Sequence, residues 1–122
     1  MRHPLIASLI VAAALGGTAL VAKPASEAAL TAAAASPLRS EANRARDQYR
    51  HPVQTLSFFG IKPTDHVVEL WPGGGWYTEI LAPYLAEKGK LTVAAPAGRP
   101  SDGIAAKLDG NATAYGKVAR AN

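Results

Sequence analysis

The sequence predicts an α/β fold with a strand–helix–strand unit at its centre. Residues 66–71 are rich in β-branched side chains, and a second short apolar run follows at residues 90–95. Between them lie a glycine-rich turn, residues 72–75, and a segment with helical spacing, residues 76–88. Strand, glycine turn, helix and strand in this order form a βαβ unit, in which the two strands run parallel.

The start of the 122-residue chain has the features of an export signal. Arg2 and His3 precede an uncharged apolar run, residues 5–22, and small residues are concentrated in residues 22–35. This order is typical of a secretory signal peptide, so we assign residues 1–35 to a signal peptide or N-terminal anchor, cleaved somewhere between residues 22 and 35. The body of the chain is then exported, to the periplasm. The alternative is an uncleaved anchor, because about 18 apolar residues approach the length that spans a bilayer, and this segment is the one membrane contact that we expect.

Composition and charge exclude several classes of function. Thirteen Lys and Arg against nine Asp and Glu give a net charge of +4, but the basic residues are spread from Arg2 to Arg120, so no nucleic-acid partner is predicted. The chain has no cysteine, which excludes disulfides, cysteine-based metal sites and thiol nucleophiles. His51 and His66 have no third donor at ligand spacing, so no metal site is predicted.

Residues 36–61 are expected to form a helical segment before the βαβ unit. Ser36 followed by Pro37 favours a helix start, and the first helix is expected over residues 38–50. We interpret its charged residues as a solvated face. These residues are Arg39, Arg46, Asp47 and Arg50.

A second, short helix is predicted from the His51–Pro52 break to Phe59, with Gly60 at its end. Its large apolar side chains are Leu56, Phe58 and Phe59. We expect them to cover an edge of the sheet.

Residues 62–122 are assigned to the domain that contains the βαβ unit. The apolar residues of the first strand do not alternate with polar ones, which predicts a parallel strand covered on both faces. In the helix, positions 77, 80, 81, 84 and 85 form one apolar stripe, and Pro83 should kink it or end it early. After the second strand, residues 104–108 are expected to be helical and residues 112–118 to begin a third strand.

The glycine-rich turn is the candidate binding site. Glu69 lies near the end of the first strand and Gly73, Gly74 and Gly75 follow it, at the end of a parallel sheet where ligands bind. Glycines let a backbone approach a nucleotide-like ligand closely, whereas a plain tight turn also needs glycine and is the alternative. Trp76 and Tyr77 either line this site or pack in the core.

Three segments of the chain resemble a bacterial family of exported class I S-adenosylmethionine-dependent methyltransferases. They are RARDQYRHP (residues 44–52), TLSFFGI (residues 55–61) and VELWPGGGWYTEILAPYL (residues 68–85). The resemblance implies a Rossmann-like methyltransferase domain that uses S-adenosyl-L-methionine as its cofactor, and the acceptor stays unknown. It implies a cofactor site built from Glu69, Trp71, Gly73, Gly74, Gly75 and Tyr77, and it names no catalytic residue.

The chain departs from the wider methyltransferase pattern at two places. That pattern has an acidic residue followed by three glycines at alternate positions, and Trp71 stands where the first glycine is expected. An acidic residue usually ends the second strand and holds the ribose, but Ala94, Ala95 and Pro96 stand there. Asp102 is a candidate substitute.

The resembled family has a longer domain with more strands, so we expect this chain to be a truncated version, doubtful as an enzyme by itself. The first strand would then lie at a free edge, a hazard for self-association. The alternative function is a non-catalytic exported α/β module that binds a protein partner through this edge or an aromatic surface.

Overall fold

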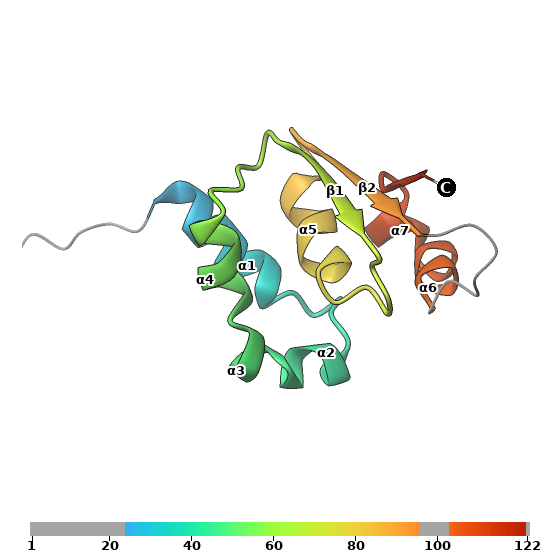
Figure 1. The fold of residues 1–122 in the computed structure, drawn as a ribbon, viewed down its shortest axis with the longest axis horizontal. Helices are drawn as coiled ribbons and strands as arrows, with labels where there is room; N and C mark the ends of the chain where they lie inside the picture. Colours follow the sequence, from blue (N-terminus) through green and yellow to red (C-terminus); the bar gives the residue numbers. More distant parts are fainter. Residues whose placement is uncertain (1–23, 96–102, 122) are drawn as a thin grey trace, which may run out of the picture.

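A computed structural model describes residues 24–95 and 103–121 of the chain. It shows a mixed α/β protein with a three-stranded parallel sheet in the order β1-β2-β3. The strands are β1 (His66–Leu70), β2 (Lys90–Ala94) and β3 (Ala119–Ala121). Figure 1 shows β1 and β2 side by side, with helix α5 (Thr78–Leu85) next to them. The predicted βαβ unit is therefore confirmed.

The register of β1 and β2 pairs His66 with Lys90 at one end and Leu70 with Ala94 at the other. It depends on a close approach between the turn before β1 and the residue before β2. A Cβ atom at Gly89, just before β2, would lie 2.6 Å from the carbonyl oxygens of both Asp65 and Pro63. Glycine at this position lets the second strand start beside the first.

Helix α5 is the centre of the core. The stripe expected from the sequence lies in the core, with Ile80, Leu81, Tyr84 and Leu85 buried. Burial extends beyond that stripe: every residue from Thr78 to Leu85 except Pro83 is buried, so the helix is enclosed almost all round. Contacts with β2, α7 (Ala112–Tyr115) and α1 (Ala25–Ala34) account for this. Pro83 lies inside the helix, which ends two residues later.

The sheet is covered on one face, which corrects the expectation that both faces of β1 are buried. Exposure alternates along β1, and in β2 Leu91 and Val93 are buried while their neighbours are not. Val67 packs with these two side chains against the core. Val68 and Leu70 point the other way and are exposed, because successive side chains of a strand point to opposite faces.

The expected helix over residues 38–50 is two short helices, α2 (Glu41–Ala45) and α3 (Asp47–Arg50). The cap is Ser40, whose hydroxyl accepts a hydrogen bond from the Asn43 N–H at 3.3 Å. Ser36 instead accepts a bond from the Leu38 N–H within a local turn. The start lies later because Arg39 turns into the protein and is buried.

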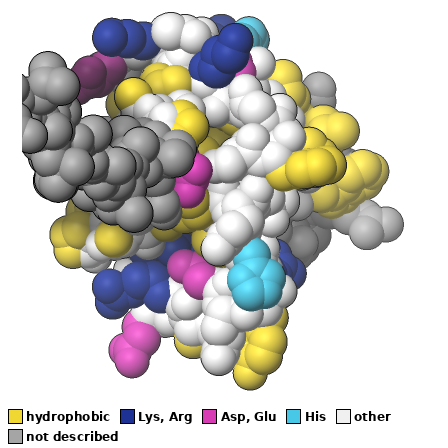
Figure 2. Space-filling view, turned by 90° about the vertical axis from the view of Figure 1, so that its left-hand side faces the viewer, with side chains coloured by type: hydrophobic (Ala, Val, Ile, Leu, Met, Phe, Trp, Pro, Cys, Tyr) yellow, Lys and Arg dark blue, Asp and Glu magenta, His cyan; other side chains and the backbone are white. Residues whose placement is uncertain are grey.

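The second short helix is confirmed as α4 (Pro52–Phe58), which follows a left-handed His51 (φ 43°) and ends before Gly60 (φ 68°). Leu56 is buried beneath it, whereas Phe58 and Phe59 are largely exposed. Figure 2 shows the side of the molecule where α1 and α4 lie, with hydrophobic side chains projecting along one flank. On this face the basic side chains form separate groups.

The packed unit includes residues that we assigned to the signal segment. Leu30 and Ala33 of α1 are buried in the core, and α1 contacts both α4 and α5. Residues 1–23, which contain the apolar run, lie outside the described part of the chain. In residues 24–95 and 103–121, no helix is both long and apolar enough to cross a membrane.

The expected helix after β2 is confirmed as α6 (Ile104–Gly110). The strand expected over residues 112–118 is wrong, because α7 begins there and β3 follows it. The side chain of Asn111 accepts a hydrogen bond from the Ala114 N–H at 3.0 Å. This cap satisfies an amide of the first helical turn and so favours a helix at this point.

Candidate functional site

The turn between β1 and α5 has an unusual backbone. Trp71, Gly73 and Gly75, at alternate positions, have φ angles of 52°, 56° and 80°. All three lie in the left-handed region that glycine enters freely and other residues enter at a cost. Trp71 therefore holds the conformation of a glycine, with its N–H donating to the Ala94 carbonyl at 3.0 Å and its side chain 69% exposed.

The three glycines of the turn differ in their surroundings. A Cβ atom at Gly73 would meet no atom of the described residues within 4 Å, and Gly74 is exposed. Gly75 is buried: a Cβ atom there would lie 2.9 Å from Cδ of Lys107 and 3.0 Å from Cδ1 of Ile104. The first part of the turn is thus open to a ligand, whereas the last part is covered by α6.

Glu69 lies one residue before the end of β1 and is held by α5. One of its carboxylate oxygens accepts a hydrogen bond from the Thr78 hydroxyl at 2.6 Å. Burial raises the pKa of Glu69 above its ordinary value, and hydrogen bonds from the side chain and backbone of Thr78 oppose that shift. Carboxylate oxygens accept more than one hydrogen bond each, so Glu69 keeps acceptor capacity for a ligand beyond its bonds to Thr78.

Tyr77 follows the glycine turn and is half-buried. Together with Glu69 it lines a groove of about 260 Å³ between α4 and β1, and the glycines of the turn do not line this groove. Trp76 is a packing residue, because it is buried and its indole N–H donates to the Asn43 carbonyl at 2.9 Å. Its ring also contacts the guanidinium of Arg50, whose central carbon is 4.9 Å from the ring centroid.

Behind the turn is a buried ionic cluster that the sequence reasoning missed. Glu79 is 2% exposed and pairs with Lys107, while its other carboxylate oxygen lies 3.8 Å from Nε of Arg39. Arg39 is also 2% exposed and makes two hydrogen bonds to Asp47, so the solvated charged face predicted from the sequence is wrong for Arg39. Glu79 lies in the first turn of a helix that is buried nearly all round, and a charged residue buried in this way needs a charged partner.

The end of β2 offers no acidic residue to hold a ribose. Ala94 is the last residue of the strand and Ala95 follows it. Pro96 and the candidate substitute Asp102 lie outside the described residues.

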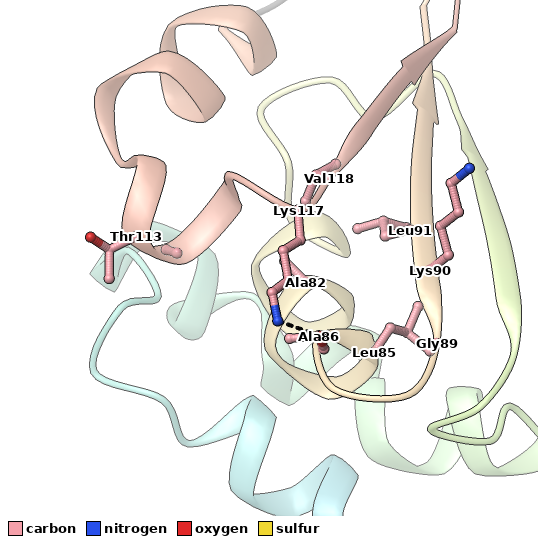
Figure 3. Close-up of a pocket in the computed structure, with 10 residues that line it drawn as sticks. Ala82, Leu85, Ala86, Gly89, Lys90, Leu91, Thr113, Lys117 and Val118 are labelled. Carbon is pink, nitrogen blue, oxygen red and sulfur yellow. Dashed lines mark hydrogen bonds between the residues drawn. The ribbon is translucent and has the colours of Figure 1, made fainter.

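A second cavity, of about 180 Å³, lies at the opposite end of the sheet, between α5, α7 and the start of β2. Figure 3 shows Lys117 reaching along it to donate a hydrogen bond to the Ala86 carbonyl at 3.0 Å. The ammonium group of Lys90 points away from it. Since ligands of parallel sheets bind at the carboxyl ends of the strands, this cavity is a gap between packed elements and is no candidate site.

Comparisons with family models, with curated proteins and with solved structures found no match for this chain.

Proposed function

We propose that the chain is a methyltransferase-like domain that binds S-adenosyl-L-methionine at the turn between β1 and α5. The observation that carries the proposal is the left-handed backbone at positions 71, 73 and 75. These are the positions at which the resembled pattern has glycines, and the backbone keeps that pattern even where the residue is tryptophan. The resemblance of residues 68–85 to the exported methyltransferase family supports the same assignment.

The described residues can make some of the contacts that such a cofactor needs. Free space at Gly73 and the exposure of Gly74 allow a ligand to contact the main chain of the turn. Glu69 is held by Thr78, and its carboxylate has acceptor capacity left for hydrogen bonds from the ligand. Among the described residues at the end of β2, Ala94 and Ala95 supply no acidic partner for the ribose, and the candidate substitute Asp102 lies outside the described part of the chain.

When bound, the cofactor would supply an electrophilic methyl group for an in-line transfer. The contribution of this chain would be to hold and orient the donor through the turn and Glu69. The acceptor is not identified by these residues.

Titration calorimetry with S-adenosyl-L-methionine tests the proposal. We expect heat of binding in the native chain, a large loss of affinity in Glu69→Ala, and unchanged affinity in Glu87→Ala, which removes an exposed carboxylate just after α5. Absence of binding at about 1 mM donor would limit the binding free energy to about −4 kcal/mol or weaker and would reject the proposal.

A second candidate function is a non-catalytic exported module that binds a protein partner. The observation that favours it is the exposure of Leu70 and Trp71, both about two-thirds exposed beside the free edge of β1. A chain that fails to bind the donor but forms a stable complex through this edge would support this second function.

A further inference from the structure

We propose that the free edge of β1 pairs with β1 of a second copy of this chain, antiparallel and about a two-fold axis through Val68. The two sheets would then join into one continuous sheet. This inference does not depend on the proposed cofactor site.

The backbone of β1 has unused hydrogen-bonding groups at this edge. The Lys90 N–H donates to the Asp65 carbonyl at 2.9 Å, and the Trp71 N–H donates to the Ala94 carbonyl at 3.0 Å. Residues 65, 67, 69 and 71 therefore face β2, since polar groups of successive strand residues point to opposite sides. His66, Val68 and Leu70 point their N–H and C=O groups to the free edge, which in the described sheet has no neighbouring strand.

Charge selects the register of the pairing. With Val68 opposite Val68 of the second copy, Glu69 faces Val67 and no two acidic residues are opposed. Shifting the two-fold axis to Val67 places Asp65 opposite Glu69, and shifting it to Glu69 places two Glu69 side chains opposite each other. Like charges directly opposite each other destabilise a sheet, so the Val68-centred register is favoured. In this register the backbone N–H and C=O groups of His66, Val68 and Leu70 that point to the edge all form hydrogen bonds with the second copy.

The apolar surface beside the edge is large enough for an interface. Phe59, Val68 and Leu70 line one groove, so the exposed side chains of α4 and β1 form a continuous surface. The exposed residues of this groove are Phe59 (68%), Val68 (53%) and Leu70 (68%). Phe58 (86%), whose ring contacts that of Phe59, and Trp71 (69%), which follows Leu70 in the chain, are exposed next to them. With about 200 Å² for a fully exposed aromatic side chain, the five expose on the order of 600 Å².

This area is at the upper end of the roughly 300–600 Å² of the largest apolar patch on a typical monomer, and it approaches the roughly 800 Å² that each partner buries in a standard interface. Because the surface is built around an edge strand, the partner that fits it is another strand with apolar side chains at alternate positions. β1 is itself such a strand, which makes a second copy the occupant that this edge matches.

The test is the molecular mass of the full chain in solution, measured by sedimentation velocity. We expect a dimer for the native chain and monomers for Val68→Lys and for Val68→Glu, because each variant opposes two like charges at the two-fold axis. Mixing the two variants in equal amounts should restore the dimer, because Lys and Glu then face each other. The matched control is Thr92→Lys: Thr92 is the β2 residue in register with Val68, one strand in from the edge, and its substitution should leave the dimer intact.

A native chain that is monomeric at all concentrations would overturn the proposal. So would association that survives Val68→Lys, as expected if the N-terminal apolar run caused it, or a mixture of the two variants that stays monomeric. Amide hydrogen exchange gives a readout that needs no variant: exchange at His66, Val68 and Leu70 should slow as protein concentration rises. Fast exchange there at every concentration would equally refute edge pairing.

Discussion

Trp71 shows how one residue can hold a conformation unsuited to it. A left-handed backbone (φ 52°) costs a non-glycine residue about 1–2 kcal/mol, and the largely exposed indole recovers little of that by burial. We therefore predict that Trp71→Gly is more stable than Trp71→Ala by about 1 kcal/mol, the reverse of the usual order of these two residues in a strand. Urea unfolding of both variants measures the difference, and an alanine variant at least as stable as the glycine variant would contradict it.

The carboxyl of Glu69 should make stability depend on pH. Burial raises its pKa in the folded protein above the ordinary 4.5, so between these two values the folded chain binds more protons than the unfolded chain. The free energy of unfolding contributed by this group therefore falls as pH rises through that window. Glu69→Gln should remove this fall, whereas Glu87→Gln, at an exposed site, should keep it. Denaturant titrations across that pH range provide the measurement, and identical pH profiles for the native chain and Glu69→Gln would refute the assignment.

At the scale of the elements, Arg39 joins the N-terminal helices to α5. Its buried guanidinium contacts Asp47 and the Ala34 carbonyl and lies near Glu79. Arg39→Met should cost about 3 kcal/mol, because it leaves Asp47 unpaired and Glu79 with Lys107 alone as its charged partner.

Arg120→Met is the matched control for that variant. It breaks an ion pair with Asp109 in which both side chains are largely exposed, so it should cost less than about 1 kcal/mol. Equal losses for the two variants, in thermal or urea unfolding, would show that the Arg39 cluster contributes no more than a surface pair.

The sequence predicts those elements whose causes lie within a few neighbouring residues. The two strands, α4, α5 and α6 were predicted because periodicity, proline and glycine act within a few residues. The burial of Arg39 was not, since Glu79 lies forty positions along the chain and only folding brings the two together. The apolar run of β1 was ambiguous for a similar reason: it cannot tell whether one face or both will be covered, which depends on helices elsewhere.

The same holds for the candidate site: the features set by neighbouring residues could be predicted, and those set by distant ones could not. Glu69 and the glycines could be identified because adjacent residues determine a turn. The cover over Gly75 could not, because it comes from Lys107 and Ile104 on α6. That Tyr77 lines the groove beside β1 likewise depends on how α5 packs against β1, which its sequence position does not reveal.

For the whole molecule, the packing of α1 sets how many N-terminal residues can be removed before the protein no longer folds. Chains that begin at Pro24 should unfold cooperatively, whereas chains that begin at Ser36 should not, because they lose Leu30 and Ala33 from the core. Removing one buried leucine side chain alone costs about 2–5 kcal/mol, a large share of the stability of a small domain. Circular dichroism during urea unfolding distinguishes the two chains.

Point variants provide the control for this prediction. Leu30→Ala should be far more destabilising than Leu38→Ala, since the side chain of Leu38 is 54% exposed. If both truncated chains unfold alike, α1 contributes nothing essential to the core. If they differ as expected, a chain cut near residue 22 keeps the fold intact, whereas a cut near residue 35 destroys it.

The ionic cluster around Glu79 also has an evolutionary consequence. Its cations come from two distant parts of the chain, Arg39 before α2 and Lys107 in α6, and both meet a carboxylate with almost no access to water. Arg39 also bonds Asp47, so the cluster holds four charges, and losing one of them leaves a partner uncompensated, while exchanging all four for apolar side chains can be nearly neutral. Descendants of this protein should therefore inherit positions 39, 47, 79 and 107 as a set, so substitutions at the four sites should covary through its lineage.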